Sequence, residues 1–180
     1  GLIDGNGREL ALNIDSLHHI GERVDPNYTT RLNRPNETMR PKLFFMSNSE
    51  NILVQGLQLK NSACWGLSFD RCNNLTIKYI YFEESTYWNN DGIDVDMTRN
   101  VLIENCRFDQ GDDGVVLKAG RNQDAWRLAR PTENVVLRNC NFAFAGSLLA
   151  IGSELSGGVR NVWVKNCTVS DPVNLLRIKT

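Results

Sequence analysis

A short pattern that begins with asparagine recurs along the chain, and it constrains the fold more than any other feature. An asparagine is followed by alternating apolar and polar residues in five places, starting at Asn51, Asn74, Asn100, Asn134 and Asn161. The starts are 23, 26, 34 and 27 residues apart. An apolar period of two predicts strands, and each unit ends near a second short apolar run. Each unit therefore reads as strand, bend and strand, with little support for helix.

Units of this size cannot bury an apolar face alone, but they can do so by winding into a coil. Successive turns of such a coil, here called rungs, stack about 4.8 Å apart through parallel strand pairing. We therefore predict an all-β fold, a right-handed parallel β-helix. It would form a single domain over residues 1–180 and be incomplete at one or both ends.

The repeat also explains two residue types that recur at fixed places in it. Cys106, Cys140 and Cys167 each fall six residues after the asparagine of their unit, so we expect one vertical column. We interpret these cysteines as small buried hydrophobic residues, although a single disulfide between column neighbours is compatible with the spacing. The repeated asparagines are interpreted as bend residues that hydrogen-bond from rung to rung.

Two segments interrupt the coil. Residues 15–42 are polar and contain both histidines and the arginines Arg23, Arg31, Arg34 and Arg40. Residues 120–133 account for the longest interval between repeats. Loops of this length on a compact scaffold often line a binding cleft.

Charge and hydropathy exclude some classes of partner. The chain has 20 Lys and Arg against 21 Asp and Glu, a net charge of -1, so we expect neither a nucleic acid nor a membrane surface as partner. No apolar run approaches the roughly 20 residues of a membrane-spanning helix. The chain begins at Gly1 without a leader and stops just after Lys179, so we expect a processed chain or a fragment. An uncovered rung end predicts that this segment alone is poorly stable or associates.

Stacking the rungs in register gathers charged residues on one outer face. The apolar pairs that must face inward together are Leu67/Phe69, Ile93/Val95, Val115/Leu117, Leu149/Ile151 and Leu176/Ile178. Side chains alternate along a strand, so the residues between them face out. Asp91 then lies one rung from Asp113, and Asp112 adjoins Asp113 in the chain. Arg177 and Lys179 lie on the same face, and Lys118 shares the outward column of Lys179.

Crowded carboxyl groups raise at least one pKa, which keeps an acid protonated beside an ionised neighbour. Such a pair is what glycosidic bond hydrolysis needs. Trp65, one rung before Asp91, could offer a flat face to a sugar, or could simply be a rim aromatic. Spacing alone leaves three interpretations open: catalysis, a solvated acidic face and cation binding.

Five segments resemble glycoside hydrolase family 28, the polygalacturonases and related pectin hydrolases, in a bacterial-type form. They are Asn61-Ser-Ala-Cys-Trp, Asn89-Asn-Asp-Gly-Ile-Asp, Gly111-Asp-Asp-Gly-Val-Val-Leu-Lys, Ile151-Gly-Ser-Glu-Leu-Ser-Gly-Gly-Val and Arg177-Ile-Lys. The resemblance implies an inverting hydrolase of α-linked galacturonan. Asp112 would be the general acid, and Asp91 and Asp113 would activate water.

The resemblance also implies substrate contacts. Arg177 and Lys179 would hold the sugar carboxylate, and Lys118 and Trp65 join the substrate-binding candidates. It implies no cofactor and no metal. The partner would be a uronate-containing polysaccharide or oligosaccharide. We expect a secreted or periplasmic protein, monomeric in its full-length form, that acts on cell-wall pectin.

One departure from the family pattern keeps alternatives open. Gly146 stands where the family has a histidine, which predicts impaired activity or a saccharide-binding pseudoenzyme. A calcium-dependent enzyme resembling pectate lyases, on the same scaffold, is the other alternative.

Overall fold

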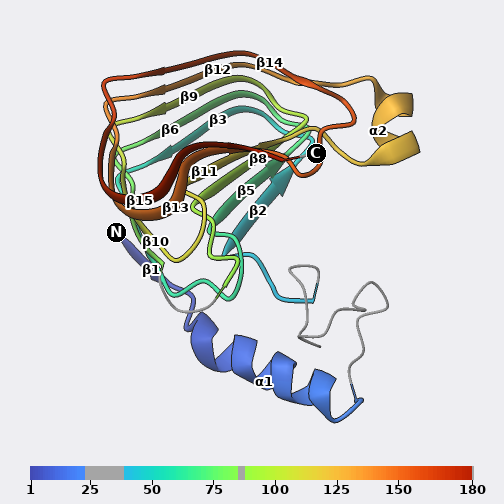
Figure 1. Ribbon diagram of the computed structural model, residues 1–180, viewed down its shortest axis with the longest axis vertical. Helices are drawn as coiled ribbons and strands as arrows, with labels where there is room; N and C mark the ends of the chain where they lie inside the picture. The colour runs from blue at the N-terminus through green and yellow to red at the C-terminus, as the bar shows by residue number, and fades with distance from the viewer. Residues whose placement is uncertain (23–38, 85–87, 180) are drawn as a thin grey trace.

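The computed structural model describes residues 1–22, 39–84 and 88–179. Within them, parallel strands stack into a coil of about five turns, and the predicted parallel β-helix is confirmed (Figure 1). One wall is a five-stranded sheet made of β3 (Glu50–Gln55), β6 (Asn73–Lys78), β9 (Arg99–Glu104), β12 (Thr132–Arg138) and β14 (Val159–Lys165).

The other strands form one ten-stranded sheet that bends to make two further walls. One of these walls contains β1 (Leu2–Asp4), β4 (Gln58–Lys60), β7 (Tyr81–Glu84) and β10 (Arg107–Gln110). The other, here called the site wall, contains β2 (Phe44–Ser47), β5 (Leu67–Asp70), β8 (Ile93–Asp96) and β11 (Val115–Lys118). The long strands β13 (Asn141–Ile151) and β15 (Thr168–Ile178) run through both walls and join them.

The register of the site wall is the one that the alternation predicted. Leu67 pairs with Ile93, Ile93 with Val115, Val115 with Leu149, and Leu149 with Leu176. Because the pairing is in phase, every second residue of each strand faces the core. The intervening residues form straight columns that face away from the core, although several of them, such as Asp94 and Val116, are buried.

The repeated asparagines stand at the bends, as predicted. All five have positive φ, between 55° and 58°, a conformation that asparagine tolerates better than most residues. Each Nδ2 of the later four donates to an Oδ1 of the asparagine in the preceding unit, at 3.0–3.1 Å. This ladder fixes the phase from rung to rung.

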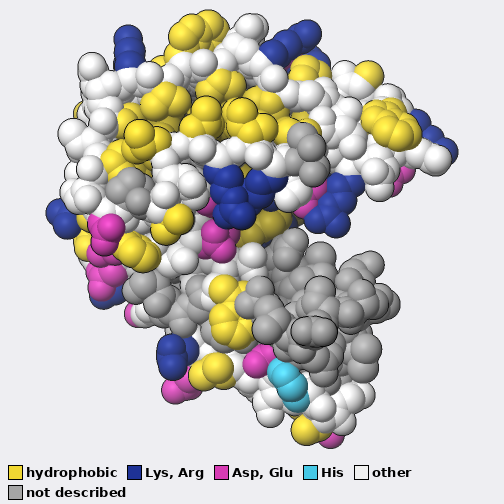
Figure 2. Space-filling view, viewed as in Figure 1, with side chains coloured by type: hydrophobic (Ala, Val, Ile, Leu, Met, Phe, Trp, Pro, Cys, Tyr) yellow, Lys and Arg dark blue, Asp and Glu magenta, His cyan; other side chains and the backbone are white. Residues whose placement is uncertain are grey.

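The core consists of stacked columns of like residues. Phe82, Phe108 and Phe142 stack with ring centroids 4.8 and 4.5 Å apart. Cys106 and Cys140 are buried as expected and Cys167 is half-buried; all three thiols are free, so the disulfide that the spacing allowed is not formed. At the end of the coil, Leu176 and Ile178 occupy core positions but are exposed, and Figure 2 shows hydrophobic side chains on this part of the surface.

The structure has two described helices in segments between strands. The alternating pattern of the sequence did not predict either helix. The first, α1 (Gly7–His19), buries Ala11 and Ile14 and begins before the expected start of the first interruption at residue 15. The second, α2 (Asn122–Leu128), lies within the expected interruption 120–133 and buries Ala125. Residues 23–38 of the first interruption lie outside the described part. Among the described residues, neither helix has the length and hydropathy needed to cross a membrane.

Candidate functional site

Backbone hydrogen bonds between rungs bring the predicted acids together at the entrance to the site wall. Gly66 N–H donates to the Asp91 carbonyl at 2.8 Å, and Gly92 N–H donates to the Asp113 carbonyl at 3.0 Å. Asp91 and Asp113 therefore occupy the same place on neighbouring rungs. One carboxylate oxygen from each of Asp91, Asp112 and Asp113 lies within 4.8 Å of the others. We call these residues the aspartate trio.

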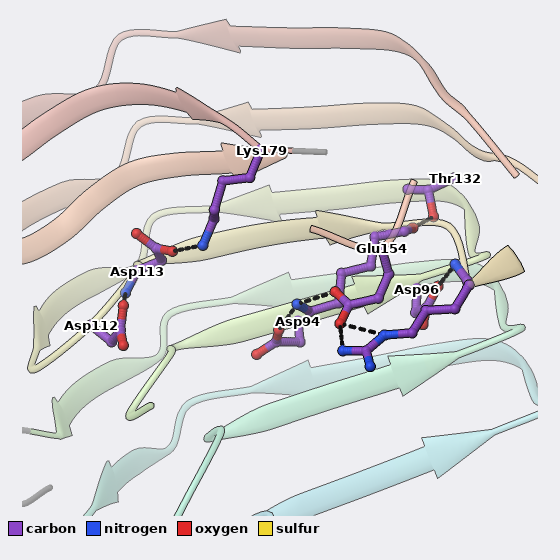
Figure 3. Close-up of polar contacts among 10 residues, drawn as sticks. Asp94, Asp96, Asp112, Asp113, Thr132, Glu154 and Lys179 are labelled. Carbon is purple, nitrogen blue, oxygen red and sulfur yellow. Dashed lines mark hydrogen bonds and ion pairs between the residues drawn. The ribbon is translucent and has the colours of Figure 1, made fainter. Parts of the chain in front are cut away.

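The three carboxyl groups differ in burial and partners. Asp91 is 6% exposed and Asp113 only 1%, whereas Asp112 is partly exposed. Asp112 Oδ1 accepts the Asp113 N–H at 2.9 Å, and its Oδ2 accepts the Asn89 N–H at 3.3 Å. Lys179 Nζ lies 3.2 Å from Asp113 Oδ2 (Figure 3). Asp113 thus has a cationic partner, and Asp112 is held by two amides.

Burial and charge crowding favour protonation within the trio. Burial is the main cause that raises the pKa of Asp91 well above its usual range, and the Asp94 and Asp112 carboxylates add to it. The pKa of Asp112 is raised by burial and by Asp113, against the opposing effect of its two amide hydrogen bonds. The two acids with raised pKa values, Asp91 and Asp112, therefore lie beside Asp113, which has the Lys179 ammonium 3.2 Å away.

The two cations predicted to hold the sugar carboxylate stand on the same outer face. Arg177 pairs in register with Ala150, which pairs with Val116, and its side chain is exposed. Lys179 lies two residues further along the chain and contacts Asp113. The site therefore presents one exposed arginine, for which the described residues supply no ion-pair partner, and one lysine already paired with an acid.

Lys118 and Trp65 form a second polar group on the site wall next to the trio: Trp65 precedes Gly66, whose N–H donates to the Asp91 carbonyl, and the Lys118 charge opposes the rise in the pKa of Asp91. Lys118 Nζ lies 2.9 Å from Glu154 Oε2, 3.8 Å from Asp94 Oδ1 and 4.8 Å from the Trp65 ring centroid. Lys42 Nζ also lies over that ring, at 4.4 Å. The groove that these residues line holds about 440 Å³.

Asp94 and Glu154 in this groove were not among the predicted site residues. Burial raises the pKa of Asp94 to about 8, in spite of Lys118 and Lys42. Burial would also raise the pKa of Glu154, but Lys118 and Arg121 outweigh it and hold that pKa at about 2. Asp94 stood in a predicted outward column and Glu154 in a recognised segment, so the sequence held a signal for both.

Gly146 lies directly against the backbone of Asp112, so a side chain at this position would contact the trio. Its N–H donates to the Asp112 carbonyl at 2.8 Å, and a Cβ at this position would lie 3.2 Å from the Asp112 carbonyl carbon. Of the two histidines, His19 lies at the end of α1, with Nδ1 2.7 Å from the Asp15 carbonyl oxygen. The described contacts of His19 are thus within α1, away from the position that Gly146 leaves without a side chain.

The trio offers oxygen ligands of the kind that hold a divalent cation, because one carboxyl oxygen of each member lies within 4.8 Å of the others. The Lys179 ammonium already lies against one of these members, Asp113. The arrangement can thus serve acid–base chemistry with the cation supplied by the chain itself.

The model of glycosyl hydrolases family 28 matches residues 1–180. A probable polygalacturonase of Vitis vinifera is 31% identical over 144 residues, which cover 78% of this chain and 29% of that protein. A probable exopolygalacturonase B of Aspergillus fumigatus is 26% identical and matches 99% of this chain but 37% of its own length.

Solved structures give the same picture. The exopolygalacturonase of Thermotoga maritima is 32% identical with a TM-score of 0.75, and covers 96% of this chain and 38% of that one. The polygalacturonase of Erwinia carotovora is 25% identical with a TM-score of 0.76, over 99% of this chain and 44% of that one. The chain thus spans less than half the length of each of these proteins.

Proposed function

Because the chain belongs to glycosyl hydrolase family 28, we propose that it hydrolyses α-glycosidic bonds of a polygalacturonan-type pectic polysaccharide. The observation that carries this proposal is the aspartate trio, with oxygens within 4.8 Å and Lys179 against one of its members. The relatives described above are named as polygalacturonases, which supports this substrate class.

Asp112 is proposed as the general acid. It is the most exposed member of the trio, so it can reach a glycosidic oxygen, and its raised pKa favours the protonated form. Proton transfer to the leaving oxygen lets the bond to the anomeric carbon break through an oxocarbenium-like transition state.

Asp113, together with Asp91, is proposed to activate the attacking water. The Lys179 ammonium lies against Asp113 Oδ2, and Asp91 Oδ1 and Asp113 Oδ1 are buried with no described hydrogen-bond partner. Two such oxygens can accept hydrogen bonds from both O–H groups of one water molecule, and one of them takes a single proton as the water oxygen bonds to the anomeric carbon. Arg177 and Lys179 are proposed to hold the uronate carboxylate by charge-assisted contacts.

The resemblance implies inversion of the anomeric configuration. The distance between the carboxyl groups of the trio gives a reason to test this. Inverting enzymes commonly separate their carboxyl groups by about 6.5–9.5 Å, and retaining ones by about 5 Å. The carboxyl oxygens of the trio, within 4.8 Å of one another, are closer together than is common in inverting enzymes. In our proposal the water sits beside Asp91 and Asp113, and no carboxylate attacks the sugar.

Gly146 favours a second candidate, a saccharide-binding pseudoenzyme. A histidine that assists proton transfer is worth on the order of 10²–10⁴ in rate, so its loss can leave binding without turnover. The trio and its cations would still bind a uronate chain in that case.

The experiment that tests these candidates is a product assay of the complete protein on a panel of pectic polymers, with a chelator present. New reducing ends without an ultraviolet-absorbing product support hydrolysis. An unsaturated product that requires calcium would identify a lyase instead, and oligogalacturonide binding without either product would identify the pseudoenzyme. We further propose that the protein acts outside the cytoplasm, on cell-wall pectin. We propose that the complete protein is a monomer.

A further inference from the structure

Arg40 is buried although it stands at the end of a polar segment. Only 3% of the residue is exposed, and its guanidinium donates to three acceptors: the Ala63 carbonyl at 2.8 Å, the Trp88 carbonyl at 2.7 Å and Asn89 Oδ1 at 2.6 Å. Burying a guanidinium is costly unless its donors are satisfied. These three acceptors belong to two neighbouring turns of the coil.

The second of these turns leads directly to the trio. Asn89 N–H donates to Asp112 Oδ2 at 3.3 Å, and Asp91 follows two residues later. Asn90 lies between them, and its Nδ2 donates to the Ser62 carbonyl at 2.8 Å and to Ser62 Oγ at 3.1 Å. The turn is thus tied to the preceding rung on one side and to Asp112 on the other.

We propose that Arg40 is a positioning residue for catalysis: it fixes the turn 88–91 so that the Asn89 amide orients Asp112 and Asp91 faces Asp113. The inference rests on the proposed function for its catalytic consequence. A lost contact at this turn would displace two members of the trio at once. Misplacement of reacting groups by about 1 Å can cost on the order of 10²-fold in rate.

The chain offers a matched control in Arg130. Its Nε donates to the Met97 carbonyl at 2.5 Å and its Nη2 to the Cys72 carbonyl at 2.8 Å, so it also joins neighbouring rungs through backbone acceptors. None of these contacts touches the trio or the turn 88–91. Loss of Arg130 removes the same kind of rung-to-rung contact without affecting the acids.

The test compares Arg40→Met, Arg40→Lys and Arg130→Met in the complete protein. We expect Arg40→Met to lower kcat by about 10²-fold with KM changed less than about threefold, as loss of reacting-group alignment predicts. Arg40→Lys keeps the charge but not the fork, so it should restore only part of kcat. Arg130→Met should leave both constants near wild type. Equal effects of Arg40→Met and Arg130→Met on kcat would overturn the proposal.

A readout that needs no activity separates this proposal from the proposed function. Amide hydrogen exchange at Asn89 should accelerate at least tenfold in Arg40→Met and stay unchanged in Arg130→Met. If the wild type hydrolyses no pectic polymer, the proposed function fails, and the exchange data alone decide the role of Arg40. An unchanged exchange rate of the Asn89 amide in Arg40→Met would contradict the proposed role of Arg40.

Asn89→Gly covers the case in which Arg40→Met does not fold. Asn89 has a φ of 60°, which glycine adopts freely, so this variant removes the Oδ1 acceptor and keeps the backbone. We expect its kcat to fall by at least about tenfold, as the kcat of Arg40→Met should also fall. A wild-type kcat in Asn89→Gly would contradict the proposal that Arg40 positions the trio through the Asn89 side chain.

Discussion

Lys179 Nζ lies 3.2 Å from Asp113 Oδ2, although 66 residues separate the two in the chain. The contact joins the end of β15 to the turn before β11, across the intervening strand β13. It exists because the coil keeps its phase over these rungs. It also places a positive charge against a buried member of the trio, since Asp113 is 1% exposed and Lys179 is the described cation bound to it.

Lys179→Met should damage both stability and pH dependence. Leaving a buried acceptor without its partner costs about 1–3 kcal/mol, which urea unfolding would measure. Lys179 also lowers the pKa of Asp112, so its removal should raise that pKa further. A general acid works below its pKa, so the basic limb of the kcat–pH profile should move to higher pH. A basic limb that moves down or stays would contradict the role of Asp112.

Asp94 predicts a pH dependence of stability that Asp94→Asn should remove. The folded-state pKa of about 8 exceeds the ordinary aspartate pKa of 3.8, so the folded state prefers the neutral carboxyl. Its contribution to stability is complete below about pH 4 and is lost as pH rises through about 8. Asp94→Asn should therefore be more stable than wild type at pH 8 and similar at pH 4. Equal urea midpoints for the two proteins at both pH values would show that Asp94 ionises freely.

The stereochemistry of the product tests how the trio uses water. Water attack opposite the leaving group on an α-linkage gives the β-anomer first. Proton NMR of the first turnovers on an oligogalacturonide should therefore show the β-anomer, which later mutarotates. If the α-anomer forms first, a carboxylate of the trio acts as nucleophile and the proposed water position is wrong.

Gly146→His tests whether the missing histidine limits the rate, with Gly146→Ala as control. Either Cβ would lie 3.2 Å from the Asp112 carbonyl carbon, so both variants require the same small backbone adjustment. We expect the histidine variant to exceed wild type in kcat by at least tenfold, within the range of an added acid–base group. The alanine variant should be no faster than wild type. Equal rates in the two variants would show that position 146 has no such role.

The sequence predicted the features that depend on periodicity. The alternation gave the register of the site wall, and therefore the meeting of Asp91 with Asp113, because in-phase parallel strands leave little freedom. The asparagine ladder followed from the same repeat. The same alternation predicts the face on which Lys179 lies, and its contact with Asp113 is a consequence of that position.

The features that the sequence could not predict arise in segments without a period. Arg40 was one of four arginines in the first interruption, and nothing in its neighbours indicated that its guanidinium would be buried against Trp88 and Asn89. The contact of Lys118 with Asp94 follows from the pairing of neighbouring strands, but its ion pair with Glu154 depends on how residues 152–158 return over the site wall. Helix α1 lies outside the repeat, so the period of two carries no signal for it.

The most direct test of the account is reducing-end release from polygalacturonate by wild type, Asp112→Asn and Asp109→Asn in the complete protein, with a chelator present. Asp109 lies in β10, on the wall that does not carry the trio, and gives the same chemical change as a control. We expect Asp112→Asn to lose at least about 10²-fold in kcat and Asp109→Asn to match wild type. Wild-type release by Asp112→Asn would contradict the account, because the trio would then not supply the proton for bond cleavage.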